Sequence, residues 1–393
     1  MLDIPSSSVL APPGPGPRPP TEVTDPVNAR ILAVSEDRIA GFLVEPFAEI
    51  ARLADLPIDT VIERLRAMLA AGTIRRIRQT LMATNLAPGA LVAWRIPAGG
   101  GADPLDAAFD FLWREDPFSG HIVIRSTDAA TPGSAYRLWT TLKVPQGFSM
   151  AKHCEHLARR IGADQWRAMP AKKLFALGVG HVRRQGMVPG AKSAELSQVL
   201  DTNIVELSPL AWRVLEPLKR ELAVDEVHPD PWRARAQQAG VSFDEFVHVA
   251  RDLNERGVIG RFSTFLEHVK PSAGGTRVTR YNALFHWRVP EGRELEAGRE
   301  VGRHHILTHC YWREAGPEFN NVNVMGVAHG TDKSLVLAHK AAIDAHLASL
   351  GVPVAYTNVF WGGRSEIKPS EISPLAYRAW CAEIGFAADA MRA

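Results

Sequence analysis

The sequence has few cysteines, no long apolar run and almost no excess of charge. Cys154, Cys310 and Cys381 are its only cysteines, and they lie far apart with no C-x-x-C pair. This spacing disfavours a disulfide scaffold and a zinc site, and it fits the reducing cytoplasm. No apolar stretch reaches the roughly 20 residues that a membrane-spanning helix needs. Residues 1–20 lack a basic segment and a continuous apolar segment, so we expect neither a secretory signal nor a membrane partner.

Charge and composition describe an ordinary globular chain. Its 45 Lys and Arg residues nearly balance 43 Asp and Glu residues, so any site for a polyanion has to be local. The 393 residues are 46% hydrophobic and 22% charged, which is typical of several folded domains. Residues 1–27 are instead dominated by Pro, Ser and Gly, and we expect them to form a disordered tail.

The chain repeats one pattern twice. Each pass opens with short amphipathic helices and a strand, as AGTIRRI (71–77) and RGVIGRF (256–262) illustrate. A β-rich block follows, beginning with ALVAWRIPAG (90–99) in one pass and ALFHWRVPEG (283–292) in the other. The first part is typical of a winged helix-turn-helix, and the order strand, helix, strand, strand, helix, strand is typical of a ferredoxin-like domain. We therefore expect an α+β protein that is a tandem duplication of both units.

These patterns predict five segments after the tail. They are winged helix-turn-helix units over 28–83 and 205–270, ferredoxin-like domains over 84–190 and 278–365, and a C-terminal helical extension over 366–393.

Phrases in both halves resemble one protein family. The first half carries EPFAEIARLADLPIDTVIERLRAMLAAGTIRRI (45–77), YRLWTTLKVP (136–145) and LFALGV (174–179). The second half carries VIGRFSTFLEH (258–268), WRVP (287–290), THCYWRE (308–314) and VNVMGVAHG (322–330). Taken in order over about residues 30–365, they resemble the siroheme decarboxylases, relatives of the Lrp/AsnC regulators, in a fused two-half form.

The resemblance implies a carbon–carbon lyase. Such an enzyme removes acetate carboxyl groups of siroheme as CO2, giving didecarboxysiroheme, in haem d1 or alternative haem biosynthesis. The iron belongs to the substrate, so the resemblance implies no further cofactor and no metal site. The duplication already supplies a pseudo-dimer, and the sequence leaves open whether a homodimer also forms.

A His-x-x-x-Arg pair stands at equivalent places in both halves. His121 and Arg125 form the first pair, and His309 and Arg313 form the second. On a strand, positions i and i+4 share a face, so each arginine can hold a carboxylate close to a histidine that supplies a proton. Tyr311 lies between the second pair and is either a core residue or a contact to the macrocycle.

Other candidates lie on and after the predicted wing strands. Arg261 begins the second wing strand, and the resemblance places a histidine, here His268, near the site. Arg75, Arg76 and Arg78 form a basic run that can clamp carboxylates, contact DNA or cover a solvated edge. The predicted catalytic residues are His309, His268 and His121, and the predicted substrate-binding residues are Arg313, Arg261, Arg76, Arg125, Tyr311 and His329.

Two other functions compete with the enzyme. The first is a DNA-binding regulator, but the predicted recognition helix over 58–70 is neutral and the one over 242–255 is net negative. A net negative helix repels the phosphates on both sides of the major groove and a neutral one gains no attraction, so we do not expect DNA as a partner. The second is a tetrapyrrole carrier or sensor without chemistry, which uses the same arginines and histidines and stays open.

Overall fold

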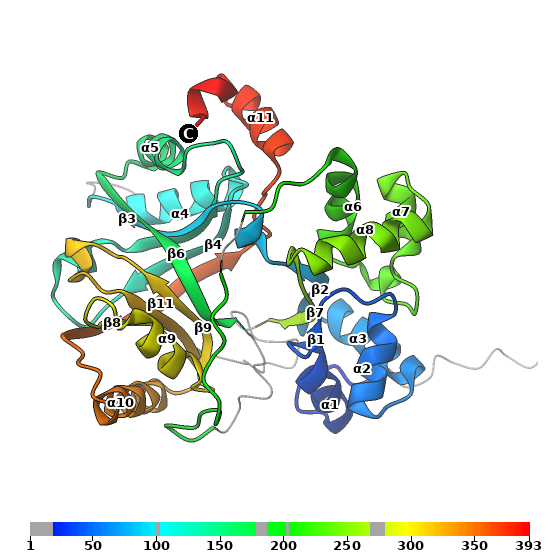
Figure 1. The fold of residues 1–393 in the computed structure, drawn as a ribbon, viewed down its shortest axis with the longest axis horizontal. Coiled ribbons are helices and arrows are strands. Elements are labelled where there is room, and N and C mark those ends of the chain that lie inside the picture. The colour runs from blue at the N-terminus through cyan, green and yellow to red at the C-terminus, as the bar shows by residue number, and fades with distance from the viewer. Residues whose placement is uncertain (1–18, 99–102, 178–186, 202–203, 268–279) are drawn as a thin grey trace, which may run out of the picture.

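The computed structural model describes residues 19–98, 103–177, 187–201, 204–267 and 280–393. They form two bodies that lie side by side, a helical body and a larger body built around a closed sheet (Figure 1). Within the described residues, no helix combines the length and the apolar character that crossing a membrane requires.

The helical body combines the winged helix-turn-helix elements of both passes. Its strands pair in the order β1-β7-β2. The first pass supplies α1 (Pro26–Ser35), β1 (Ile39–Ala40), α2 (Pro46–Ala54), α3 (Ile58–Ala70) and β2 (Ile74–Leu81). The second pass supplies α6 (Pro209–Lys219), α7 (Arg233–Ala239), α8 (Phe243–Glu255) and β7 (Ile259–Leu266).

The two winged-helix units share one sheet and one core. The wing strands β2 and β7 pair antiparallel, with Ile77 opposite Thr264. Phe47 of the first pass packs edge-to-face on Phe262 of the second, with ring centroids 5.3 Å apart. Since both rings are fully buried in the same cluster, the units predicted over 28–83 and 205–270 fold as one body.

Each half of the larger body has the element order of a ferredoxin-like domain. The first half contains β3 (Gly89–Arg95), α4 (Pro104–Arg114), β4 (Ser119–Ser126), β5 (Leu138–Lys143), α5 (Met150–Ile161) and β6 (Gln165–Leu177). The second contains β8 (Tyr281–Arg288), α9 (Glu294–Gly302), β9 (Leu307–Arg313), β10 (Val324–Gly330), α10 (Lys333–Ser349) and β11 (Tyr356–Ile367). The predicted fold class, a duplicated α+β unit, is confirmed.

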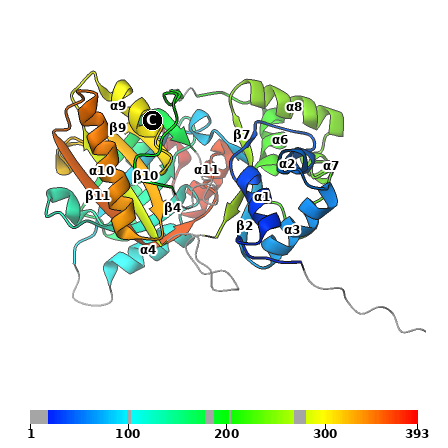
Figure 2. The ribbon, with the colours of Figure 1, turned by 90° about the horizontal axis from the view of Figure 1, so that it is seen from below.

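The two four-stranded sheets join at both edges. Strand β6 pairs with β9 and strand β11 pairs with β4, so the eight strands close into a ring. Helices α4 and α5 cover the first half from outside, and α9 and α10 cover the second (Figures 1 and 2). Trp139, Phe319 and Phe360 pack against one another inside the ring and fill part of its interior.

The C-terminal segment departs from its predicted bounds. Strand β11 continues through Ile367, so the boundary expected at 365 falls inside this strand. Helix α11 covers only Pro374–Glu383, and a short 3-10 turn follows at Ala388–Met391. Tyr377 and Trp380 of α11 are buried in the outer layer of the first half.

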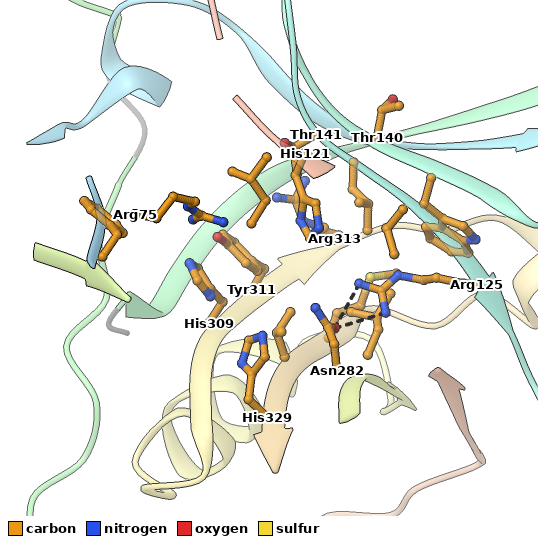
Figure 3. A pocket seen from close by; sticks show the side chains of 18 of the residues that line it. Arg75, His121, Arg125, Thr140, Thr141, Asn282, His309, Tyr311, Arg313 and His329 are labelled. Atoms are coloured by element: carbon orange, nitrogen blue, oxygen red, sulfur yellow. Dashed lines mark hydrogen bonds between the residues drawn. The ribbon is translucent and has the colours of Figure 1, made fainter. Parts of the chain in front are cut away.

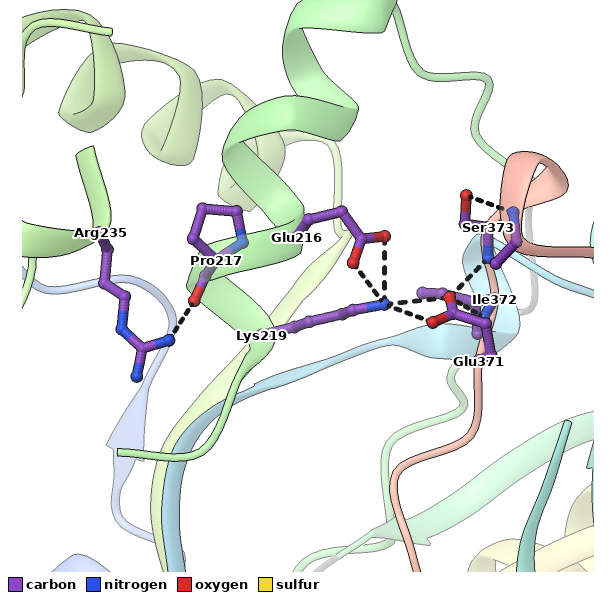
Figure 4. Close-up of polar contacts among 8 residues, drawn as sticks. Glu216, Pro217, Lys219, Arg235, Glu371, Ile372 and Ser373 are labelled. Carbon is purple, nitrogen blue, oxygen red and sulfur yellow. Dashed lines mark hydrogen bonds and ion pairs between the residues drawn. The ribbon is translucent and has the colours of Figure 1, made fainter. Parts of the chain in front are cut away.

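A partly buried lysine ties the helical body to the segment after β11. The Lys219 ammonium group on α6 lies 2.9 Å from a Glu216 oxygen and 3.1 Å from a Glu371 oxygen (Figure 4). The same Glu371 oxygen accepts hydrogen bonds from the main-chain N–H groups of Ile372 and Ser373. This network holds the wing strands over one end of the ring.

Candidate active site

A cavity of about 280 Å³ lies inside the ring, at the end that faces the wing strands. Strands of both halves and the wing strands β2 and β7 contribute to its walls. The cavity continues into an outer groove of about 1010 Å³, and both spaces are lined by Arg78, His121 and Tyr311.

Strand β9 places three of the candidate side chains in the cavity. Alternation along the strand points His309, Tyr311 and Arg313 to the same side (Figure 3). The rings of His309 and Tyr311 are nearly parallel, at 12° and 6.1 Å between centroids. The guanidinium group of Arg313, two residues further along the strand, lies over the Tyr311 ring, 4.4 Å from its centre. The tyrosine therefore positions both the histidine and the arginine.

A buried hydroxyl links two histidines of the cavity. The Oγ1 atom of Thr308 lies 3.0 Å from Nδ1 of His309 and 3.3 Å from Nδ1 of His329. It also donates to the main-chain oxygen of Val327 at 3.2 Å. Since a hydroxyl has a single proton, Thr308 accepts from the histidines while it donates to Val327. This arrangement favours the tautomer with the proton on Nδ1 and leaves the contact of Thr308 on the Nδ1 side of each ring.

Strand β4 provides the corresponding row of the first half. His121, Val123 and Arg125 line the cavity, and Nε2 of His121 lies 2.8 Å from the Ser365 hydroxyl. Both terminal nitrogens of Arg125 donate to the Asn282 side-chain oxygen at 3.3 Å (Figure 3). Burial lowers the pKa of Arg125 to about 10, well below its ordinary value.

The basic run of the first wing forms the wall at the cavity mouth. Arg76 is only 5% exposed and binds Glu221 at 3.0 Å and the Ile367 carbonyl at 2.9 Å. Burial, together with the charge of Arg76, lowers the pKa of both Arg75 and Arg78 to about 10. These shifts mean that cationic groups are crowded in a poorly solvated place.

The cavity combines cationic and apolar walls. Among its described lining residues, none is Asp or Glu. The Nε atoms of Arg75, Arg76, Arg78 and Arg125 are buried and have no hydrogen-bond partner in the structure. Buried donor atoms without partners are costly, and a bound anion that accepts from them removes that cost. The apolar part of the wall consists of Leu91, Val123, Trp139, Phe265, Leu266, Leu284, Met325, Val327 and Ile367.

The structure brings most of the predicted site residues together. Those that line the cavity are His309, His121, Arg313, Arg76, Arg125, Tyr311 and His329. Arg261 does not line it, because this residue lies at the β1 side of the wing sheet, where Asp37 and Glu36 partly offset the lowering of its pKa by burial. His268 lies outside the described residues.

Sequence reasoning missed several lining residues. Arg75 and Arg78 belong to the basic run, of which only Arg76 was predicted to bind substrate. Asn282 and Thr141 carried no motif of their own. The internal repeat could have indicated Thr141, because this residue occupies in the first half the position of Val327 in the second, and both line the cavity. In the described part of the chain, no cluster of three or more His, Cys, Asp or Glu side chains could hold a metal ion.

Comparison with known proteins agrees with this architecture. The model of a family described as the AsnC-like ligand binding domain matches residues 279–353. The chain is 25% identical over 292 residues to a siroheme decarboxylase of Hydrogenobacter thermophilus, spanning 73% of this chain and 78% of the relative. It is 32% identical over 83 residues to the siroheme decarboxylase beta subunit of Oleidesulfovibrio alaskensis, spanning 21% of this chain and 49% of that subunit.

Solved structures share the fold over almost the whole chain. The crystal structure of the siroheme decarboxylase NirDL has a TM-score of 0.62 at 18% identity, covering 91% of this chain and 97% of NirDL. A crystal structure of NirDL with an iron-uroporphyrin III analogue has a TM-score of 0.61 at 17% identity, covering 91% and 99%. The chain is thus similar to siroheme decarboxylases over most of its length, and its second half contains a match to the AsnC-like ligand binding domain.

Proposed function

We propose that the protein is a siroheme decarboxylase, a carbon–carbon lyase that converts acetate arms of the tetrapyrrole to methyl groups. The cavity carries this proposal, because five arginines and three histidines meet an apolar wall there without a carboxylate among the described lining residues. Siroheme is a flat apolar macrocycle with eight carboxylates at its rim. Its shape and charge match a slot whose walls are apolar and whose rim is cationic.

The net reaction takes up one proton for each acetate arm. The group –CH2–COO⁻ and a proton become –CH3 and CO2. The bond between the methylene and carboxyl carbons breaks, its electron pair passes into the conjugated ring, and the proton completes the methyl group. The iron enters with the substrate, and the proposal requires no further cofactor.

His309 is the proposed proton donor. Thr308 fixes its Nδ1 side at 3.0 Å, and the Tyr311 ring holds its plane. A histidine so oriented keeps its Nδ1–H bond to Thr308 and, in the imidazolium form, donates the second proton from Nε2 to the substrate. His121 has the corresponding place in the first half, where Ser365 contacts its Nε2 atom.

The winged helix-turn-helix elements support binding to the cavity better than binding to DNA. On α3, Arg64 pairs with Asp25 at 3.1 Å and Arg66 donates to the Val227 carbonyl at 2.8 Å. These basic side chains are used in packing within the helical body. A group of five arginines, on β2 and inside the ring, lines the cavity instead.

Anaerobic incubation with siroheme, followed by mass spectrometry of the extracted tetrapyrrole, tests the proposal. We expect the wild-type protein to remove carboxyl groups as CO2, and His309→Ala to abolish that loss while still binding siroheme. His248→Ala, at an exposed position on α8, is the matched control and should react as the wild type does.

Each failure of this experiment has a separate meaning. Siroheme that binds but stays intact in the wild type would identify a carrier or sensor. Retention on DNA that weakens steeply with salt, without siroheme binding, would identify a regulator.

A further inference from the structure

The strand register relates the two halves of the ring position by position. In the first half, Lys143 on β5 lies opposite Gly89 on β3. In the second half, His329 on β10 lies opposite Asn282 on β8. Lys143 and Gly89 therefore occupy the places that His329 and Asn282 occupy in the other half.

Gly89 leaves open the space that Asn282 fills. In the second half, the Asn282 side-chain oxygen accepts two hydrogen bonds from Arg125 at 3.3 Å. In the first half, a Cβ atom built on Gly89 would lie 3.5 Å from Cγ and 3.7 Å from Nζ of Lys143. Where one half offers an amide oxygen, the other half offers an ammonium group.

Arg313 is the counterpart of Arg125, but its surroundings differ. Each arginine donates from Nη1 to a main-chain carbonyl of the neighbouring strand, Met169 for Arg313 and Phe360 for Arg125. Arg125 has the Asn282 amide as a second partner. At the corresponding side of Arg313 the register places Gly89, which has no side chain to accept a hydrogen bond.

Three cations consequently gather at the cavity mouth. Lys143, Arg78 and Arg313 line the outer groove together with Gly89. Burial, followed by the charges of Arg313 and Arg78, lowers the pKa of Lys143 to about 8. Within the described part of the chain, no Asp or Glu forms an ion pair with any of the three. Such a cluster is costly in an empty site and favourable around an anion.

We propose that Lys143, Arg78 and Arg313 form a carboxylate subsite that anchors a substrate arm which keeps its carboxyl group, an inference that rests on the proposed function. Loss of CO2 moves negative charge from the carboxylate into the macrocycle. Three cations around a carboxylate stabilise the starting state more than the transition state, so this arm is held and does not react. The subsite therefore orients the macrocycle and places the reacting acetates elsewhere in the cavity.

Equilibrium binding of siroheme and of didecarboxysiroheme, followed by absorbance, tests the subsite in Lys143→Met. Because the anchored carboxylate is present in both compounds, we expect both Kd values to rise by about tenfold. The kcat for siroheme should change by less than about threefold, because the reacting arm is not held here. Lys143→Arg should restore binding. Lys172→Met, on β6 and outside this cavity and groove, should bind as the wild type does.

Gly89→Asn tests the same subsite without removing a charge. The new side chain begins at ordinary contact distance from Lys143, and it places an amide where Asn282 holds Arg125 in the other half. We expect it to compete with the substrate for Arg313 and to raise both Kd values.

The outcomes separate this inference from the proposed function. A Kd that rises for siroheme alone would mean that the subsite holds a reacting acetate, and unchanged binding in both variants would mean that no carboxylate binds there. Either result overturns the subsite while turnover by the wild type still supports the enzyme. If the variants raise both Kd values as expected but the wild type releases no CO2, the proposed enzyme is overturned and the subsite is not. If the wild type does not bind siroheme, both are overturned.

Discussion

The strands β4 and β9 present the same three positions to the cavity, but their side chains interact differently. On β9, Tyr311 contacts both its neighbours in the row, stacking on His309 and lying beneath Arg313. On β4, the middle position is Val123, and the arginine turns to an asparagine of the other half. In the duplicated scaffold, the three side chains on β9 therefore contact one another, whereas the arginine on β4 bonds to a residue of the other half.

This difference shows where a duplicated site can specialise. Pairing between strands fixes the backbone positions in both halves, and Arg125 and Arg313 even donate to corresponding main-chain carbonyls. The chemistry changes at three pairs of side chains: Val123 and Tyr311, Gly89 and Asn282, Lys143 and His329. The second half should therefore carry the proton transfer, and the first half should mainly bind and orient the substrate.

The largest effect should come from removing the histidine of each row. We expect His309→Ala to lower the single-turnover rate of CO2 release at least about 100-fold, the usual contribution of a general acid, and His121→Ala to lower it about tenfold. Rapid mixing of enzyme in excess over siroheme, under anaerobic conditions, measures both rates. Equal losses of rate in the two variants would show that His309 and His121 contribute equally, which would contradict the assignment of proton transfer to the second half.

A smaller effect should follow when the β9 row is made to resemble the β4 row. Tyr311→Val removes the ring that contacts His309 and Arg313, and we expect the Kd for siroheme to rise about tenfold. Tyr311→Phe keeps the ring and should bind within about threefold of the wild type. If the phenylalanine variant binds as weakly as the valine variant, the hydroxyl rather than the ring is important.

The Asn282 amide should contribute a still smaller amount, to stability rather than to turnover. Asn282→Ala leaves Arg125 buried with one carbonyl partner, so the free energy of unfolding without ligand should fall by about 1 kcal/mol. Siroheme supplies the missing anion, and its stabilising effect on thermal unfolding should exceed that seen in the wild type. An equal shift in Tm for both proteins would mean that Arg125 does not contact the substrate.

Local patterns in the sequence predicted the elements and much of the site. The alternation of a strand places His309 and Arg313 on one face, and the same alternation adds Tyr311 because it lies two residues from each. The basic run on the first wing strand was visible as charge, and Arg76 was selected from it although Arg75 and Arg78 also line the cavity. The ferredoxin-like order likewise followed from the pattern of short strands and helices.

Long-range pairing was beyond the reach of those patterns. Nothing local states that β6 pairs with β9 or that β11 pairs with β4, yet this closure places His121 and His309 in one cavity. The fusion of the wings into a single sheet has the same origin, and it places Arg261 at the β1 side of β7, away from Phe265 at the cavity. Position along a strand, as well as its face, decides which arginine reaches the substrate.

The smallest effect concerns the network that holds the wing over the ring. Burial tends to raise the pKa of Glu371, but Lys219 and the N–H groups of Ile372 and Ser373 outweigh it and lower that pKa. Since the carboxylate is favoured in the folded state, its contribution is complete above the ordinary pKa near 4.5 and is lost as the pH falls through the lowered value. Glu371→Gln should therefore cost about 1 kcal/mol of unfolding free energy at pH 7, a value that allows for partial solvent screening.

Urea unfolding at several pH values, with Lys219→Met and the double variant completing a cycle, measures this contribution. The difference between wild type and Glu371→Gln should shrink toward zero in acid, and the coupling between Glu371 and Lys219 should shrink with it. Arg76 contacts the carbonyl of Ile367, four residues before Glu371, so a loosened network should also shift the wing arginines and weaken siroheme binding by no more than about threefold. A larger loss of binding, at unchanged stability, would show that the carboxylate acts on the substrate directly and that the first-half side of the cavity does more than orient it.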